Sequence, residues 1–185
     1  MADVLDCIGN TPLQELEIPH QGDNWRVFAK LEFLNPSGSV KDRIARHILI
    51  NARRRGELRD GMSIIEATSG NTGIALSMVG AVLGHKVIVV MPEHMSRERV
   101  RIMESLGAEV CLTSRGGSFA GAVEKVNELA QGHPTFYRPR QFENPDNVAA
   151  HFETTGPEIW EQSEGEVDAL VLSQGTGGTL TGAGR

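Results

Sequence analysis

Short apolar runs alternate along the chain with longer segments in which apolar residues recur every three or four positions. The runs predict strands at residues 27–33, 63–67, 86–91, 109–113 and 168–173. None of them alternates cleanly between apolar and polar residues, as expected when helices bury both faces of a parallel sheet. The pattern therefore predicts an α/β fold with helices between the strands.

The segments of helical period carry apolar stripes that predict core-facing surfaces. The stripe that follows Lys41 consists of Ile44, Ala45, Ile48, Leu49 and Ala52. The stripe that follows Ser118 consists of Phe119, Ala122, Val123, Val126 and Ala130. A further helix is expected from Ser96 to Leu106, where Gly107 ends it. The two tryptophans, Trp25 and Trp160, are expected to pack within the scaffold.

The charge balance excludes one class of partner. The 185 residues include 18 basic and 24 acidic side chains, a formal net charge of −6. A nucleic-acid binder needs a basic surface, and the only basic run, residues 53–55, is interpreted as the solvated end of a helix. We therefore expect no nucleic-acid partner.

Cysteine and histidine usage gives no indication of a disulfide framework or a metal site. Cys7 and Cys111 lie far apart, and the six histidines lack ligand spacing. The first residues lack the basic and apolar regions of a secretory signal, and no apolar run approaches the roughly 20 residues that span a bilayer. We expect a soluble, cytoplasmic protein with no membrane partner.

Three segments gather small or hydroxylated residues just after predicted strands, the edge where open parallel sheets bind ligands. In the first, residues 35–43, Lys41 stands at the start of a helix behind a tight loop. The positive end of the helix dipole disfavours a second cation, which lowers the pKa of a lysine and favours the free amine needed for nucleophilic chemistry. Taken alone, Lys41 is better explained as a solvated surface charge in the first turn of a helix.

The second segment, residues 66–73, runs from a strand end into a helix. Thr68, Ser69, Asn71 and Thr72 offer polar groups around the glycines at a helix N-terminus, which suits a carboxylate. An ordinary N-cap is the alternative. In the third segment, residues 173–182, repeated glycines and threonines predict a phosphate-binding loop, and a flexible connection is the alternative. A reactive lysine, a carboxylate site and a phosphate site together predict pyridoxal 5′-phosphate as the cofactor of an enzyme that acts on amino acids.

These segments resemble the cysteine synthase (O-acetylserine sulfhydrylase) family of fold-type II pyridoxal-phosphate enzymes. The resemblance rests on Asn35-Pro36-Ser37-Gly38-Ser39-Val40-Lys41-Asp42-Arg43, Thr68-Ser69-Gly70-Asn71-Thr72-Gly73, Gln141-Phe142-Glu143-Asn144-Pro145 and Gly175-Thr176-Gly177-Gly178-Thr179. Residues 8–13 and 154–160 are similar to two further blocks of the family, and residues 91–99 and 144–147 resemble its B-type members. The motifs occur in the family's order over essentially the whole chain.

The resemblance implies a role for each of these segments. Lys41 would form the imine with the cofactor and, once released, remove the substrate α-proton, while Asn71 would bind the oxygen on the cofactor ring. The carboxylate of the substrate would be held by Thr68, Ser69, Gly70, Thr72 and Gln141. The cofactor phosphate would be held by Gly175, Thr176, Gly177, Gly178 and Thr179.

The implied reaction is a β-replacement in which O-acetyl-L-serine loses acetate and a sulfur nucleophile, sulfide or thiosulfate, adds to give L-cysteine. O-phosphoserine remains open as the donor, and two alternatives are kept: a cystathionine β-synthase-like reaction with homocysteine, and a truncated, non-catalytic binding or regulatory protein.

The resemblance also implies two lobes and a homodimer. Residues 36–145 would form a smaller, mobile lobe that closes on carboxylate binding, and residues 1–35 and 146–185 an incomplete large lobe. Family members are considerably longer, so we expect the chain to be the N-terminal part of such an enzyme, without the residue that contacts the pyridine nitrogen.

Overall fold

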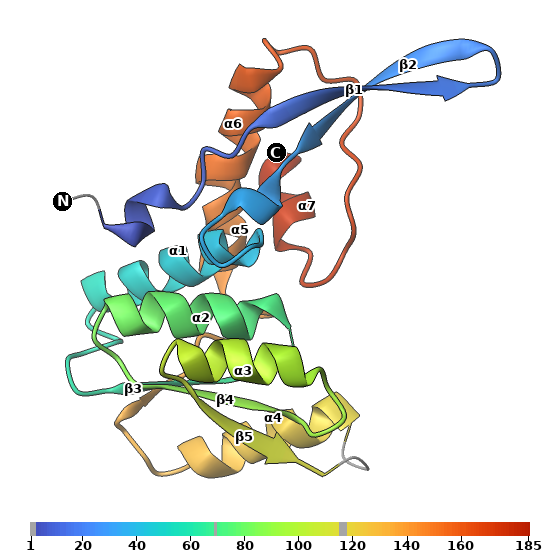
Figure 1. The fold of residues 1–185 in the computed structure, drawn as a ribbon. Coiled ribbons are helices and arrows are strands. Elements are labelled where there is room, and N and C mark those ends of the chain that lie inside the picture. Colours follow the sequence, from blue (N-terminus) through green and yellow to red (C-terminus); the bar gives the residue numbers. More distant parts are fainter. Residues whose placement is uncertain (1–2, 69, 115–117) are drawn as a thin grey trace.

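A computed structural model of the protein describes residues 3–68, 70–114 and 118–185. Helices and strands alternate along most of the chain (Figure 1). The strands are β1 (Leu13–His20), β2 (Asp23–Lys30), β3 (Ser63–Ala67), β4 (Val87–Pro92), β5 (Glu109–Thr113) and β6 (Phe136–Tyr137). The α-helices are α1 (Lys41–Arg54), α2 (Asn71–Val82), α3 (Arg97–Ser105), α4 (Ser118–Ala130), α5 (Pro145–Ala150), α6 (Gly156–Gln162) and α7 (Gly178–Ala183). Short 3-10 turns at Val4–Cys7 (η1) and Glu32–Leu34 (η2) and a π-helical turn at His151–Thr155 (η4) complete the order.

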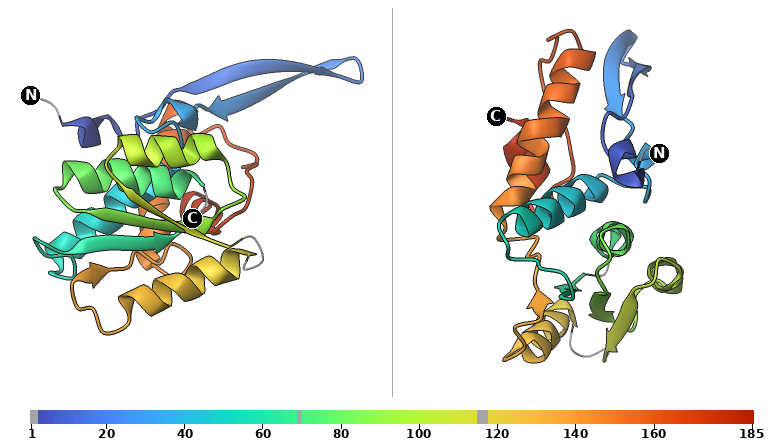
Figure 2. Two further views of the ribbon diagram at one scale, coloured as in Figure 1. Left: turned by 60° about the horizontal axis from the view of Figure 1, so that its bottom comes forward. Right: turned by 90° about the vertical axis from the view of Figure 1, so that its left-hand side faces the viewer.

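The central element is a four-stranded parallel sheet in the order β5-β4-β3-β6. Ile64 pairs with Val87, and Ser63 pairs with Phe136 on the other side of the same strand. Helices α2 and α3 lie on one face of the sheet and α4 on the other (Figures 1 and 2). The predicted α/β class is confirmed, and so are the strands predicted around β3, β4 and β5.

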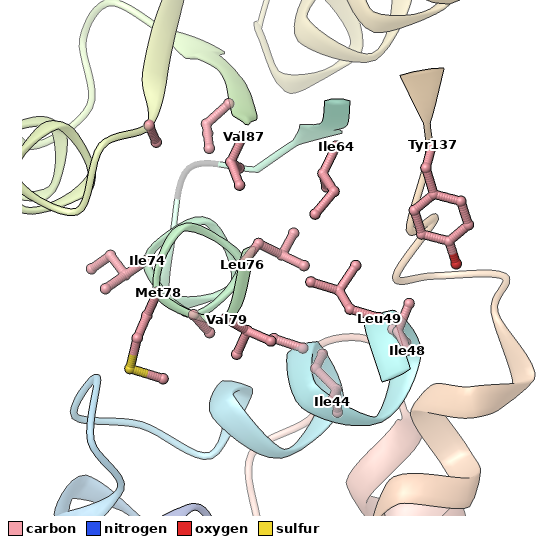
Figure 3. Packing of buried hydrophobic residues seen from close by; sticks show 14 of the residues in the cluster. Ile44, Ile48, Leu49, Ile64, Ile74, Leu76, Met78, Val79, Val87 and Tyr137 are labelled. Carbon is pink, nitrogen blue, oxygen red and sulfur yellow. The ribbon is translucent and has the colours of Figure 1, made fainter. Parts of the chain in front are cut away.

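Helix α2 is buried on nearly all sides because it lies between the sheet and α1 (Figure 3). Leu76 and Val79 pack in the same cluster as Ile64 and Val87 of the sheet and Leu49 of α1. This explains why the sequence of α2 shows no polar face, in contrast to the amphipathic α1. Packing in this core therefore holds α1 and α2 in a fixed position relative to each other.

The apolar stripe of α1 is buried throughout, as predicted, and the arginines at its end are exposed. On the other face of the sheet, Ala122 and Val126 of α4 are buried and Phe119 packs against them. Val123, by contrast, is 36% exposed, so its predicted place in the core is wrong. The stripe of α4 is narrower than the sequence indicates, because only the helix face that packs on β4 and β3 is buried.

The N-terminal strands form an antiparallel hairpin apart from the main sheet, and it projects away from the body in Figure 1. The strand expected at residues 27–33 is thus shifted and changes partner, since β2 ends at Lys30. Gln21 and Gly22 both have positive φ, 52° and 94°, which is the geometry of a two-residue hairpin turn. The first strand of the hairpin was not predicted.

Two further expectations are wrong. Residues 168–173 form no strand, no described strand lies beside them, and Val171 is 92% exposed. A strand needs a neighbour to satisfy its backbone groups, and an apolar run alone does not supply one. Trp25 and Trp160 are 60% and 62% exposed, so they do not pack within the scaffold. In the part of the chain that the structure describes, no helix is long and apolar enough to cross a bilayer.

Candidate active site

The sheet order places a topological switch point, where a ligand site is expected, at the carboxyl ends of β3 and β6. From β3 the chain continues to β4 on one side, whereas β6 lies on the other side of β3. Loops that leave two such strands part from each other, and open α/β sheets bind ligands in the resulting crevice. The chain segments that follow these two strands are the predicted carboxylate segment and the segment that contains Gln141.

The structure brings Thr72 and Gln141 together at this crevice. Both side chains are buried, and the Thr72 hydroxyl donates to Oε1 of Gln141 at 2.7 Å. Thr68 is buried beside them, and Gly70 caps α2 with its N–H 3.4 Å from the Thr68 hydroxyl. Asn71 is exposed at the first position of α2. These residues surround the N-terminus of a helix, whose N–H groups attract anions.

The predicted contact residue Ser69 lies outside the described residues. The loop that follows β3 is therefore defined by the positions on either side of Ser69, Thr68 and Gly70.

Lys41 is the first residue of α1 and is half-buried. Burial lowers the pKa of its amine, since a charged ammonium loses hydration in the protein interior. The direction agrees with the prediction, although the cause is burial and not the helix dipole that the sequence argument invoked. A lowered pKa increases the fraction of free amine, the form that reacts with an aldehyde.

The two residues after Lys41 fix the start of α1. Asp42 is fully buried and accepts hydrogen bonds from the backbone N–H of Ser37, at 2.7 Å, and from its hydroxyl. Arg43 is buried in the opposite direction and forms ion pairs with Glu32 and Glu158 at 2.7 and 2.6 Å. Because Asp42 and Arg43 are both buried and hydrogen-bonded, they hold the backbone from which the Lys41 side chain extends.

The predicted phosphate loop leads into α7. Gly177 has φ of +80° and precedes the helix, so a side chain there would be strained. Gly178 is buried, and a Cβ at this position would lie 2.0 Å from Oδ1 of Asn147. The loop therefore requires glycine at two consecutive positions, one for its backbone conformation and one for its close contact with α5.

Asn147 joins the carboxylate segment to the phosphate loop. Its Nδ2 donates to the carbonyl oxygen of Gln141 at 2.8 Å and to the hydroxyl of Thr176 at 2.9 Å. A chain of hydrogen bonds thus runs from Thr72 through Gln141 and Asn147 to Thr176. The structure connects two of the three predicted site segments in this way.

His151 connects the phosphate loop to η4 and is affected by the charge of Lys41 in the first segment. Its Nε2 lies 3.1 Å from the hydroxyl of Thr179, and its Nδ1 lies 2.9 Å from that of Thr155. Burial, together with the positive charges of Arg43 and Lys41, lowers the pKa of His151 to about 4, so the ring is neutral. The charge of Lys41 contributes to this shift, so the lysine lies within electrostatic range of His151.

Sequence reasoning missed Asn147, His151 and Glu66 as members of this region. Asn147 and His151 had a usable signal, because both lie within ten residues of Gln141, in α5 and at the start of η4. Glu66 is a carboxylate in an otherwise apolar strand, and its Oε2 accepts a hydrogen bond from the N–H of Arg140 at 2.7 Å. A charged residue in a buried strand is itself a signal for a polar site.

Comparison with known proteins identifies the family. The chain belongs to the pyridoxal-phosphate dependent enzyme family, whose model matches residues 4–185. It is 48% identical over 180 residues to the cysteine synthase of a Flavobacterium species, covering 97% of this chain and 58% of that protein. It is 46% identical over 179 residues to cysteine synthase A of Escherichia coli K12, covering 96% of this chain and 54% of that protein.

Solved structures agree with the sequence relatives. The cysteine synthase of Entamoeba histolytica superposes with a TM-score of 0.92 at 46% identity, over 99% of this chain and 55% of that one. A hydrogen sulfide-producing enzyme of Fusobacterium nucleatum superposes with a TM-score of 0.93 at 44% identity, over 97% of this chain and 55% of that one. The predicted resemblance to fold-type II cysteine synthases is confirmed, and the chain spans just over half the length of these relatives.

Proposed function

We propose that the protein acts as a cysteine synthase that replaces the β-substituent of O-acetyl-L-serine with sulfide or thiosulfate, giving L-cysteine and acetate. The observation that carries this proposal is the hydrogen-bonded connection from Thr72 through Gln141 and Asn147 to Thr176, together with the half-buried Lys41 at the start of α1. It joins a site suited to a carboxylate with a site suited to a phosphate. The named relatives favour this reaction over one with homocysteine.

The residues present fit pyridoxal 5′-phosphate. A Cβ at Gly175 would meet no atom within 4 Å, so the loop has open space on that side, while Thr176 and Thr179 place hydroxyl groups along it. Neutral N–H and O–H donors suit an anion without adding a competing cation near Lys41. When bound, the cofactor supplies an aldehyde that reacts with amines and a ring that stabilises negative charge on the substrate α-carbon.

Each protein group then has a defined task. Lys41 Nζ holds the cofactor and later accepts the α-proton, for which a lowered pKa is favourable. The substrate carboxylate is held by the residues around the start of α2 and by the side chain that meets them, namely Thr68, Ser69, Gly70, Thr72 and Gln141. Asn71 binds the oxygen on the ring, and the phosphate is held by Gly175, Thr176, Gly177, Gly178 and Thr179.

Reduction with borohydride tests the role of Lys41. We expect protein that is incubated with pyridoxal 5′-phosphate and then reduced to carry one pyridoxyl group on the peptide containing Lys41, as measured by mass spectrometry. Lys41→Ala should lose this label and the visible absorbance of the cofactor. Lys86→Ala is the matched control, because Lys86 is an exposed lysine paired with Glu109 at the sheet edge. A label on another lysine in the wild type would refute the assignment.

We further infer that residues 36–145 form a mobile lobe that closes over the site and that residues 1–35 and 146–185 belong to a larger lobe. The main sheet with α2, α3 and α4 lies entirely within the first range, which supports this division. Small-angle scattering with and without O-acetyl-L-serine tests it, since closure should reduce the radius of gyration of the loaded protein.

We also propose that the protein is a cytoplasmic homodimer. Trp25 and Trp160 offer exposed apolar surface for a subunit contact, and Cys7 and Cys111 are both free, which suits a reducing compartment. Light scattering of the purified protein measures the assembly state, and fractionation of the source cells measures the location.

A further inference from the structure

Glu66 is a buried carboxylate that the proposed reaction does not use. It is the fourth residue of β3 and only 8% exposed, among Ile64, Ile65 and Ala67. Burial of the carboxylate raises its pKa to about 7, an effect that nearby backbone N–H groups and, to a smaller extent, the positive charge of Arg138 only partly oppose. A buried acid of this kind carries a cost, so the contacts that it makes are informative.

The partners of Glu66 are backbone N–H groups at the carboxyl end of β6. Its Oε2 accepts a hydrogen bond from the N–H of Arg140 at 2.7 Å, and the N–H groups of Gln141 and Ala67 also donate to the carboxylate. Arg140 has φ of +52°, a left-handed conformation that costs free energy for a residue other than glycine. The carboxylate holds the chain in this conformation through its N–H.

The residue that follows the strained position is Gln141. Its side chain meets the Thr72 hydroxyl at 2.7 Å, and its carbonyl oxygen accepts from Asn147 at 2.8 Å. The direction of the Gln141 side chain depends on the backbone at residues 140 and 141, and Glu66 is the group that binds that backbone from within the sheet. The carboxylate lies behind the proposed substrate site and not in it.

We propose that Glu66 is a positioning residue: its carboxylate fixes the backbone of Arg140 and Gln141 so that the Gln141 side chain is presented to Thr72 for binding of the substrate carboxylate. This inference rests on the proposed function, because it names what controls the affinity of that same site. Protonation of Glu66 replaces an ionised acceptor of several N–H groups by a weaker, neutral one. The groups that act on it are its uncharged backbone donors and the charged side chain of Arg138.

The sign of the pH dependence follows. Glu66 ionises as pH rises through about 7, so the affinity of the site for a carboxylate should be higher above this pH and lower below it. Glu66→Gln is an uncharged isostere that cannot ionise, and it should resemble the protonated wild type at every pH. Loss of one charge-assisted hydrogen bond corresponds to a decrease in affinity of about tenfold.

The experiment uses L-alanine, which has an amine and a carboxylate but no β leaving group, as the ligand of the protein loaded with pyridoxal 5′-phosphate. Its affinity is measured from the absorption spectrum of the cofactor between about pH 5.5 and pH 8.5, a range centred on the pKa of Glu66. We expect wild type to bind about tenfold more tightly than Glu66→Gln at the high end and equally at the low end. The affinity for the cofactor itself should be unchanged.

A matched control and a readout without the cofactor complete the test. Glu143→Gln removes the same charge from the same segment, but the Glu143 side chain is 75% exposed and should leave L-alanine binding unchanged. In the unloaded protein, the amide NMR signals of Arg140 and Gln141 should titrate near pH 7 in wild type and not in Glu66→Gln.

Two outcomes overturn the proposal: equal L-alanine affinity of wild type and Glu66→Gln over the whole pH range, or wild-type amides that do not titrate near pH 7. A wild type that fails to bind the cofactor would contradict the proposed function instead. In that case the amide titration still decides whether Glu66 holds the segment.

Discussion

Glu158 of α6 pairs with the buried Arg43 of α1 and with Lys30 of β2. Replacing Glu158 tests how much these ion pairs contribute to the stability of the protein. The Glu158 oxygens lie 2.6 and 2.7 Å from Nη1 and Nη2 of Arg43, and one of them is 2.8 Å from Nζ of Lys30. The Arg43 side chain is 1% exposed and the Glu158 side chain 16% exposed. The backbone N–H of Asn10 also donates to Glu158 at 2.8 Å.

The magnitude follows from the pKa of Glu158. The hydrogen bonds from Arg43 and Lys30 lower it from 4.5 to about 2 in spite of burial, which corresponds to about 3 kcal/mol in favour of the ionised state. Glu158→Gln keeps the shape but leaves Lys30 without its ion pair and Arg43 with only Glu32. Breaking a buried pair from one side typically costs about 3 to 5 kcal/mol. We expect the variant to lose about 3 kcal/mol of unfolding free energy at neutral pH.

The pH dependence of the difference in unfolding free energy provides a second test. The folded-state pKa of Glu158 is depressed, so its stabilising contribution is present above about pH 4.5 and is lost as pH falls toward about 2. The difference between wild type and Glu158→Gln should therefore be constant between about pH 7 and pH 5 and shrink below pH 4.5. Urea unfolding followed by far-ultraviolet circular dichroism measures it.

Glu161→Gln is the control, because it removes the same charge from an exposed position of the same helix. It should change the unfolding free energy by less than about 0.5 kcal/mol. Equal losses in the two variants, or a loss in Glu158→Gln that does not diminish at low pH, would refute the argument that the network with Arg43 stabilises the protein.

Three further predictions concern other parts of the fold. Gly80→Ala should lose about 1 to 3 kcal/mol in urea unfolding because a Cβ would lie 2.3 Å from a Val87 methyl, whereas Gly121→Ala, in open space within α4, should gain up to about 1 kcal/mol. The ring of His151 should stay neutral down to about pH 4 in nitrogen NMR spectra, and a titration near pH 6.5 would contradict this. Because the pKa of His151 is lower in the folded than in the unfolded protein, its contribution to the unfolding free energy is lost as pH falls from about 6.5 to 4. Gly178→Ala should bind pyridoxal 5′-phosphate at least about tenfold more weakly in an absorbance titration, because a Cβ there meets Asn147. Its circular dichroism should match that of wild type, and an unchanged affinity would contradict the assignment of this loop.

Strands β3, β4 and β5 of the main sheet were predictable because each carries an apolar run within its own short segment. Strands β3 and β4 are buried and mostly apolar, β5 is a shorter apolar run at the partly exposed sheet edge, and the turn glycines Gly61, Gly84 and Gly107 all adopt positive φ between the units. The hairpin lacked this signal. Strand β1 carries exposed charged residues and Pro19, and only the positive φ of Gln21 and Gly22 defines its turn. A run with no adjacent strand, residues 168–173, produced the opposite error.

The candidate site divides in the same way. Its loops could be predicted because glycines and hydroxyl residues are unusual in composition, and the family resemblance assigned their roles. The partners that hold those loops were missed although each carried a local signal, because contacts such as those of Glu66 and Asn147 join segments distant in the sequence. Glu66 is 74 residues from Arg140, and Asn147 is 29 residues from Thr176. Sequence patterns report the face that a residue presents, not the chain segment that approaches it.

The reversal of strand order between β4 and β6 explains why these buried polar groups collect at one place. At the carboxyl end of β3 the neighbouring loops leave in different directions: the N–H of Thr68 still pairs with Val90 of β4, whereas the N–H of Arg140 bonds to the Glu66 carboxylate. Glu66 accepts from some of these groups, and the Gln141 side chain and carbonyl engage Thr72 and Asn147. A ligand carboxylate placed at this edge would replace water at donors that the sheet cannot use. The strand order therefore gathers polar groups at this edge, and Glu66 binds one of the backbone N–H groups there from the interior of the sheet.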